Sequence, residues 1–245
     1  MTHLLSKSKY IRGLQCERAL WLDVHEPRLA RYTAEQMRRF DRGRDFEYAF
    51  KALFPDGIDL SAELKRNVDL YPARTAELLD LRPCPAAKTV LFEAGFQYDD
   101  VLVLADVVCQ REDGSLDIYE VKSGTTLSDT YRRDAALQHY VISHCRPVHS
   151  FSIVYNGAPA SCRPDAIEDA GKMPALQDGP FAIVDLTAEL AAEGDRIAAN
   201  IAEMKTIVRA TAEPDTPTGQ HCLTPYACPY QHHCQQGVRQ LSLFG

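Results

Sequence analysis

Two short stretches of sequence decide the fold: LAD at residues 104–106 and DIYEVKSG at residues 117–124. Apolar and β-branched residues surround both, as in buried strands, and the turn EDGS at residues 112–115 separates them. Glu120 and Lys122 are two residues apart, so a strand places both side chains on one face. We therefore expect two neighbouring strands that bring Asp106, Glu120 and Lys122 to one end of a small sheet.

These three side chains suit a divalent cation that prefers oxygen ligands. We expect Asp106, Glu120 and the Val121 backbone carbonyl to bind Mg²⁺ or Mn²⁺, with Lys122 beside the attacking water. The chemistry that this arrangement predicts is phosphodiester hydrolysis. The alternative is an ordinary surface ion pair between Glu120 and Lys122, because such pairs are common and contribute little to stability.

The length of 245 residues is enough for one sizeable core. We expect a single domain with an N-terminal helical segment (1–32), a core (33–210) and a C-terminal tail (211–245). The sequence has no apolar run of about 18 residues and no signal peptide. A cytoplasmic protein without membrane contact is therefore expected.

The charge is unevenly distributed along the chain. The net charge of -7 argues against a protein that coats DNA regardless of sequence. Residues 1–51, however, hold eleven Lys and Arg against seven Asp and Glu, a net charge of +4. This segment is the expected surface for phosphates, and its densest basic group is Arg38, Arg39, Arg42 and Arg44. A solvated helix face is the alternative interpretation of that group.

A helix is predicted from Thr33 through Leu53, with Thr33 and Gln36 forming a capping box. Glu47 on this helix follows Gly43 by four residues, where the missing side chain leaves room for a ligand. We expect Glu47 to be a further metal ligand, and an exposed helix glutamate is the alternative.

Three strands are predicted next, over residues 89–98, 101–110 and 115–121, as an antiparallel meander. Glu93 in the first strand points either towards the metal site or to water. A strand at 151–155 is expected to join the sheet in parallel through a crossover helix, and a further strand is expected at 181–185. A central mixed sheet flanked by helices, and so an α/β fold, is the predicted architecture.

The crossover helix is predicted to start near Ser128 or Asp129 and to end near His144. Tyr131 and Gln138 lie two turns apart on one face of it, where they could orient a substrate phosphate or the attacking water. Two more helical regions are expected: residues 6–22, with a turn near Gly13, and residues 187–209. Residues 158–180 are rich in Pro, Gly and Asp and predict a long irregular connection.

The C-terminal tail carries a second group of candidate ligands. Cys222, Cys228 and Cys234 stand within thirteen residues, among prolines and aromatic residues that core packing does not explain. A chain without an export signal is not expected to use them in disulfides. Three thiolates require a fourth ligand to hold a structural zinc or an iron-sulfur cluster. Cys16 is the candidate, and its alternative is a small buried apolar residue.

Taken together, these motifs resemble a known superfamily. The spacing D-x13-E-x-K resembles that of the PD-(D/E)XK nucleases. One cysteine before such a core and three after it look like the RecB-like iron-sulfur nucleases, such as the CRISPR-associated RecB-like exonuclease and the AddB nuclease domain. The resemblance covers nearly the whole chain. It implies roles for Asp106 and Glu120 as metal ligands, Lys122 as a catalytic residue, Gln138 as the helix glutamine, and Cys16, Cys222, Cys228 and Cys234 as ligands of a [4Fe-4S] cluster.

Three departures from the family pattern are present. The last three cysteines read C-x5-C-x5-C, whereas the family usually has C-x2-C-x5-C. This keeps zinc open as the alternative cofactor, with His221, His232 or His233 as replacement ligands. Glu47 stands where the family often has a histidine. Ile142 stands where it often has a tyrosine, and Tyr140 and Tyr131 are the candidate substitutes.

The expected function is a Mg²⁺- or Mn²⁺-dependent deoxyribonuclease with a PD-(D/E)XK core and a structural [4Fe-4S] cluster that joins the two ends of the chain. The resemblance implies exonuclease activity on single-stranded or end-bearing DNA. Two other functions are alternatives. One is an accessory subunit that binds nucleic acid without cutting it, alongside CRISPR adaptation or repair proteins. The other is a zinc-stabilised interaction module.

Overall fold

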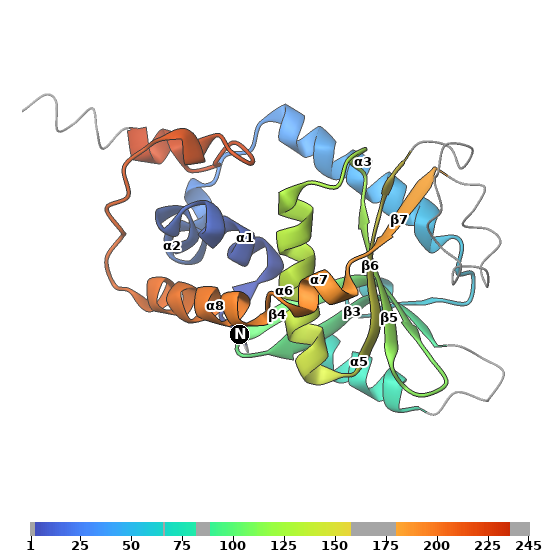
Figure 1. The fold of residues 1–245 in the computed structure, drawn as a ribbon. Coiled ribbons are helices and arrows are strands. Elements are labelled where there is room, and N and C mark those ends of the chain that lie inside the picture. The colour runs from blue at the N-terminus through green and yellow to red at the C-terminus, as the bar shows by residue number, and fades with distance from the viewer. Residues whose placement is uncertain (1–2, 66, 82–88, 158–179, 236–245) are drawn as a thin grey trace, which may run out of the picture.

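The fold is that of a computed structural model that describes residues 3–65, 67–81, 89–157 and 180–235, with backbone alone at residues 39–42. A twisted sheet occupies one side of the molecule, and helices from both ends of the chain pack together on the other side (Figure 1). Within these ranges, no helix has both the length and the apolar character needed to cross a bilayer.

The sheet is mixed, as predicted. Its strand order is β2-β3-β4-β5-β6-β7, and β1 pairs with β4 from outside this path. The meander of β3, β4 and β5 is antiparallel, and β6 joins β5 in parallel through a crossover helix, which confirms both predictions. The strands are β1 (Leu5–Ser6), β2 (Ile58–Asp59), β3 (Val90–Tyr98), β4 (Val101–Gln110), β5 (Leu116–Lys122), β6 (Val148–Asn156) and β7 (Phe181–Asp185).

The helices cover both faces of the sheet. Helices α5 and α6 pack against β3, while α3 packs against β5. The capping box predicted for α3 is present, because Thr33 and Gln36 exchange hydrogen bonds between side chain and backbone. The α-helices are α1 (Lys7–Gln15), α2 (Glu17–His25), α3 (Ala34–Lys51), α4 (Leu60–Leu64), α5 (Tyr71–Asp80), α6 (Asp129–Cys145), α7 (Thr187–Ala191) and α8 (Gly194–Arg209).

Two of the helix predictions were wrong in detail. The expected turn near Gly13 does not exist: α1 runs through Gly13, and the chain breaks at Cys16 instead. A Cβ atom at Gly13 would lie 2.7 Å from Cε of Met204, so this glycine lets α1 pack closely on α8. The region 187–209 forms two helices rather than one. Most of the connection predicted at 158–180 lies outside the described residues.

An aromatic cluster fixes α3 on its face of the sheet. Phe50 is fully buried, and its ring contacts the rings of Phe54, Tyr119 and Phe181. Edge-to-face contacts of this kind add to the burial of apolar area. The position of Glu47 on α3 therefore depends on this cluster.

The two ends of the chain are joined by contacts between α1, α2 and the C-terminal segment. The Trp21 indole N–H donates to the Ala210 carbonyl at 2.9 Å, and Arg18 pairs with Glu213 at 2.5 Å. The Gln15 amide donates to the carbonyls of His221 and Tyr226, both at 2.7 Å. In Figure 1 the tail, in red, accordingly lies over the blue helices α1 and α2.

We predict that Phe50→Ala lowers the free energy of unfolding by about 3–5 kcal/mol, because it leaves a cavity among three rings. Urea denaturation followed by circular dichroism measures this change. Tyr48→Ala is the matched control, since the Tyr48 side chain is 61% exposed on the same helix and its loss is expected to cost less than about 0.5 kcal/mol. Equal destabilisation by the two substitutions would contradict the assignment of Phe50 as the anchor of α3.

Candidate functional site

The site forms where β3 and β4 are irregular. The register of the two strands places Glu93 across from Asp106, between the pairs Phe92–Val107 and Ala94–Ala105. Glu93 has a φ of 55°, in the left-handed region that a residue with a side chain adopts at a cost of about 1–2 kcal/mol. Strained residues of this kind are frequent at functional sites.

The irregularity changes which way the neighbouring side chains point. On β3, Leu91 and Ala94 belong to the core beneath α6, although strict alternation would place them on opposite faces. On β4 the same holds for Ala105 and Val108. The break in each strand falls between these residues, in the segments that carry Glu93 and Asp106.

Three carboxylates converge at this point. Glu47 from α3, Glu93 from β3 and Asp106 from β4 each offer an oxygen atom, and these atoms all lie within 4.8 Å of one another. Lys51, one helical turn after Glu47, places its ammonium group against Glu47 and 2.7 Å from Glu93 Oε1. The Lys51 side chain is only 7% exposed, so it is a buried counter-ion for two of the three acids.

Two lysines hold Glu120 next to these carboxylates. Lys7 from α1 donates to Glu120 Oε1 at 2.9 Å, and Lys122 donates to the same atom at 2.5 Å. Lys122 also donates to Asp134 Oδ2 on α6 at 2.5 Å. The second Glu120 oxygen, Oε2, is buried and makes no hydrogen bond. Glu120 is therefore fixed in place while one of its oxygens remains available to a further ligand.

Helix α6 brings Tyr131 and Gln138 to the same region. The Lys122 ammonium lies 5.7 Å from the centre of the Tyr131 ring. A Cβ atom at Gly124 would lie 2.6 Å from the Tyr131 hydroxyl, so the glycine makes room for this ring. Gln138 is fully buried, yet neither its amide oxygen nor its amide nitrogen makes a hydrogen bond. Such an unsatisfied amide is costly unless a ligand completes it.

Burial and neighbouring charges shift the pKa values of these groups in opposite directions. Burial raises the pKa of Asp106 well above its usual range, and the charge of Glu120 raises it further. Burial alone would also raise the pKa of Glu120, but the ammonium groups of Lys122 and Lys7 lower it below its usual range. Burial would lower the pKa of Lys51, yet Glu93 and Glu47 raise it above its ordinary value.

The residues present fit a divalent cation with oxygen ligands. Octahedral ligands at about 2.1 Å from Mg²⁺ lie at most about 4.2 Å apart, close to the spread of the three-carboxylate group. A cation there would also favour the charged form of Asp106, which burial opposes. Of the metal ligands predicted from the sequence, the structure places Glu47 and Asp106 in this group and adds Glu93. Glu120 lies outside the group, bound to the two lysines, and the Val121 carbonyl remains a predicted ligand.

Three residues of the site were not found from the sequence. Asp134 lies between Tyr131 and Gln138 on α6, so the helical spacing of those two residues was an available signal. Lys51 follows Glu47 by four residues and was detectable in the same way. Lys7 is 113 residues from Glu120, and no local pattern indicates that contact.

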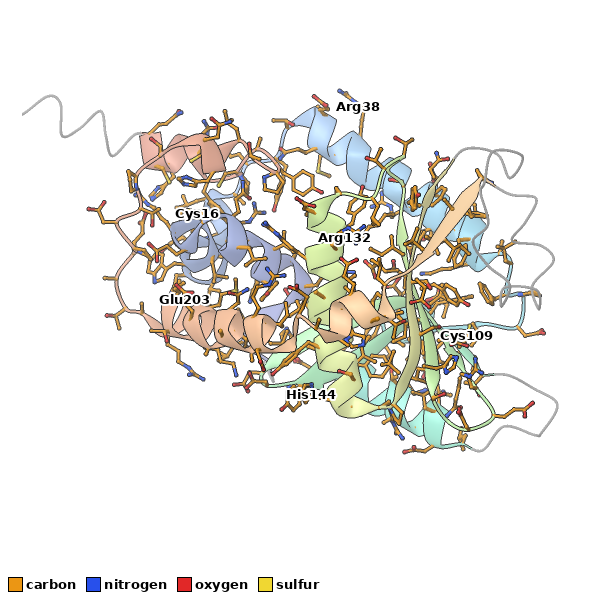
Figure 2. All side chains as sticks on the ribbon, viewed as in Figure 1. Cys16, Arg38, Cys109, Arg132, His144 and Glu203 are labelled. Carbon is orange, nitrogen blue, oxygen red and sulfur yellow. The ribbon has the colours of Figure 1, made fainter. Side chains whose placement is uncertain are left out.

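The fold brings the four cysteines that are predicted to bind a cluster into one region of the molecule. Cys16, Cys228 and Cys234 pack in one apolar group with Trp21, and the Cys228 backbone N–H donates to the Cys222 carbonyl at 2.8 Å. All four are free thiols. Burial raises the pKa of Cys16, Cys228 and Cys234, and neighbouring cysteines raise it further. Figure 2 shows Cys16 in the helical part of the molecule, far from Cys109 on the sheet.

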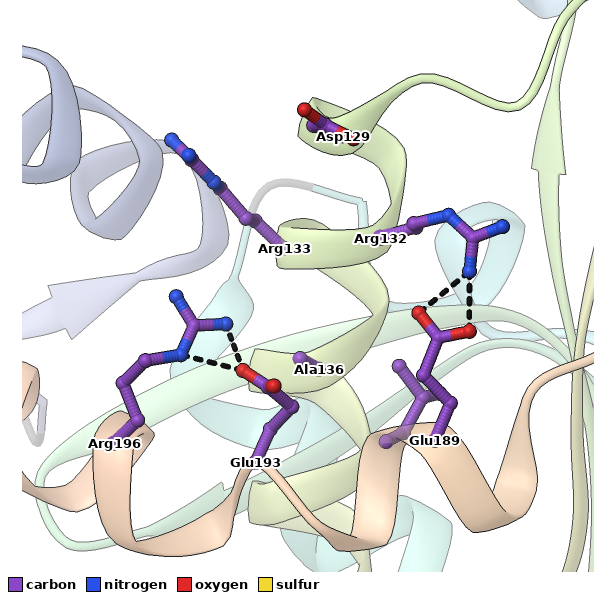
Figure 3. Close-up of a pocket in the computed structure, with 8 residues that line it drawn as sticks. Asp129, Arg132, Arg133, Ala136, Glu189, Glu193 and Arg196 are labelled. Carbon is purple, nitrogen blue, oxygen red and sulfur yellow. Dashed lines mark hydrogen bonds and ion pairs between the residues drawn. The ribbon is translucent and has the colours of Figure 1, made fainter.

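A separate pocket of about 230 Å³ lies between α6 and the helices α7 and α8. Arg132 pairs with Glu189 across it, and Arg196 pairs with Glu193 (Figure 3). Arg133 extends away from both pairs. The Arg132–Glu189 pair connects α6 with α7, while the Arg196–Glu193 pair lies at the start of α8.

Comparisons with known proteins do not assign the chain to a family. No protein-family profile matches it, and no curated protein matches it. Among solved structures, that of SSO0001 is similar, with 11% sequence identity and a TM-score of 0.35 over 95% of this chain and 85% of that chain. A score of this size carries no argument about function, so the assignment depends on the geometry of the site.

We predict that Lys51→Met destabilises the metal-free protein by about 3 kcal/mol, because Glu47 and Glu93 lose their shared counter-ion. Mn²⁺ is expected to raise the melting temperature of the variant more than that of the wild type, since the cation replaces the lost ammonium group. Thermal melts with EDTA and with Mn²⁺ measure both effects. Lys65→Met, at an exposed position, is the control. An equal response to Mn²⁺ in variant and wild type would contradict this role for Lys51.

Proposed function

We propose that the protein is a metal-dependent deoxyribonuclease of the PD-(D/E)XK type, acting on single-stranded or end-bearing DNA. The observation that carries the proposal is the convergence of Glu47, Glu93 and Asp106 next to Glu120 and the doubly anchored Lys122. A group of acids beside a positioned ammonium is the arrangement that phosphodiester hydrolysis requires. An ordinary surface ion pair does not fit, because Glu120 is fully buried.

Each group in the site has a role in the proposed reaction. Glu47, Glu93 and Asp106 would hold Mg²⁺ or Mn²⁺, with Glu120 and the Val121 carbonyl as further ligands. When bound, the cation supplies charge stabilisation and activation of the attacking water. Lys122 would orient that water and offset negative charge in the transition state, and Asp134 keeps its ammonium group in place. Gln138 and Tyr131 would hold the substrate, which would satisfy the unpaired Gln138 amide.

The cysteine group is proposed to hold a [4Fe-4S] cluster that ties the tail to α1 and α2. Among the described residues, the four thiols form no group whose sulfur atoms all lie within 4.8 Å of one another. A single tetrahedral zinc with bonds of about 2.3 Å requires thiolates about 3.8 Å apart. A cubane binds each thiolate at a different iron and so requires wider spacing. Four cysteines complete the ligand set of a cubane without a histidine, which favours the cluster over zinc with His221, His232 or His233 as a ligand.

Two other functions are alternatives to the nuclease, and each predicts a different experimental result. A non-cleaving subunit of a CRISPR adaptation or repair assembly would bind DNA but show no metal-dependent hydrolysis. An interaction module stabilised by zinc would contain zinc and no iron. The buried acids and the unsatisfied Gln138 favour the enzyme over both, because neither alternative has a use for them.

We predict that Asp106→Ala and Lys122→Ala each reduce Mn²⁺-dependent cleavage of single-stranded DNA by at least about 100-fold. Denaturing gels with end-labelled oligonucleotides measure the rate. Arg146→Ala is the control, because Arg146 pairs with the exposed Asp80 side chain and not with the acids of the site. A wild-type protein that binds DNA and cuts none with either metal would support the accessory subunit instead.

We also predict that the protein purified without oxygen is brown and contains about four irons and four sulfides per chain. Cys16→Ser, made at a position separate from the tail, is expected to abolish the colour and the iron content. Elemental analysis measures iron, zinc and sulfide together. One zinc per chain without iron would show that the cysteines hold zinc, because a zinc site is colourless.

A further inference from the structure

Two lysines share one oxygen of Glu120, and they are not held equally. Lys122 donates to Glu120 Oε1 at 2.5 Å and to Asp134 Oδ2 at the same distance. Lys7 donates to Glu120 Oε1 at 2.9 Å, and this is its single ion pair among the residues that the structure describes. Lys7 is therefore the lysine that can leave Glu120 at the smaller cost.

The backbone of Lys7 is fixed, whereas its ammonium group stays accessible. Strand β1 pairs with β4 immediately before Lys7, and α1 begins at Lys7 itself. The Lys7 side chain is 28% exposed, against 18% for Lys122 and 1% for Glu120. Its flexible stem lets the ammonium group turn without movement of the backbone. A ligand that arrives from solvent meets Lys7 before Lys122.

The acids of the site outnumber its lysines. When all of these groups are ionised, five carboxylates exceed three ammonium groups by two charges. This excess of negative charge repels a phosphate, and one divalent cation balances it. Phosphate binding is therefore expected to depend on a cation. The acids are Glu47, Glu93, Asp106, Glu120 and Asp134, and the lysines are Lys7, Lys51 and Lys122.

The free oxygen of Glu120 connects the cation to Lys7. Glu120 Oε2 is buried and makes no hydrogen bond, so it is the oxygen left for a cation. A carboxylate that also binds a cation attracts its two ammonium groups less strongly, because three positive groups then share one negative charge. Lys122 keeps Asp134 as a partner. Lys7 then lacks a full counter-charge, and a phosphate oxygen supplies one through a charged hydrogen bond.

We propose that Lys7 is a substrate-binding residue whose partner changes with the cation. Lys7 rests on Glu120 while the acids are empty, and it binds a phosphate of the DNA strand once a cation occupies them. The inference rests on the proposed nuclease function and deepens it, because it assigns the phosphate contact and makes cation and DNA bind cooperatively.

The test removes the ammonium group with Lys7→Met. Lys9→Met is the matched control, because it removes the same charge from α1, where Lys9 Nζ contacts the Leu4 carbonyl and none of the acids of the site. Isothermal titration calorimetry measures the affinity for Mn²⁺ alone. It then measures the affinity for thymidine 5′-monophosphate, with saturating Mn²⁺ and in EDTA. This nucleotide has no diester bond, so its binding is measured without cleavage.

We expect Lys7→Met to bind Mn²⁺ about 3-fold more tightly than the wild type, because an ammonium group that competes for Glu120 is gone. With Mn²⁺ present, it is expected to bind the nucleotide at least about 10-fold more weakly, because the phosphate loses a charged hydrogen bond. In EDTA, Lys7→Met and the wild type are expected to bind the nucleotide equally weakly. Lys9→Met is expected to match the wild type throughout.

Two results would overturn the inference. Unchanged or weaker Mn²⁺ binding by Lys7→Met would show that Lys7 does not compete for Glu120. Nucleotide affinity with Mn²⁺ that Lys7→Met leaves unchanged, or that Lys9→Met lowers as much, would show that Lys7 does not bind the phosphate.

A second variant keeps the test valid if Lys7→Met does not fold. Lys7→Gln retains a hydrogen-bond donor for Glu120 without the charge, and we expect the same two shifts from it. Both shifts, together with no DNA cleavage by the wild type, would support the phosphate contact of Lys7 and refute the nuclease.

Discussion

The site depends on one hydrogen bond, from the Val121 backbone N–H to Asp106 Oδ2, at 2.7 Å. The ladder between β4 and β5 ends at the pair Val107–Tyr119, immediately before this point. The Asp106 carboxylate then takes the place of a backbone acceptor, so the two strands can separate without leaving a buried N–H unsatisfied. The space between them is where the acids and lysines meet. A regular ladder here would have closed the sheet and excluded any ligand.

The other three acids of the site each lie against an ammonium group. Glu120 has Lys7 and Lys122, and Lys51 lies against Glu47 and Glu93. Burial of an uncompensated carboxylate costs several kcal/mol, so each ammonium contributes to the stability of the fold. The acids come from a helix and three strands, and each element is fixed by its own apolar packing. The geometry is therefore set by the fold before any ligand arrives.

The sequence predicted the elements better than the contacts. Strand alternation and turn residues predicted β3, β4 and β5, and the spacing of Glu120 and Lys122 placed them correctly on one face. Strand alternation did not predict which face of β3 the Glu93 side chain occupies. The left-handed backbone conformation of Glu93 determines this, and no local sequence pattern indicates that conformation. The sequence did not predict the contact of Lys7 with Glu120, because tertiary packing of α1 brings the two residues together. The turn predicted at Gly13 is wrong, because this glycine lies within α1 and permits close packing on Met204.

The nine-residue helix α1 links the acidic site to the C-terminal tail that carries the cysteines. It is a stiff rod about 13 Å long. Lys7 at one end is bonded to Glu120, and Gln15 at the other end is bonded to the tail carbonyls of His221 and Tyr226. Removal of the segment that carries His221 and Tyr226 would release the end of α1 opposite Lys7. This segment therefore helps to hold Lys7 beside Glu120 from the other side of the helix bundle.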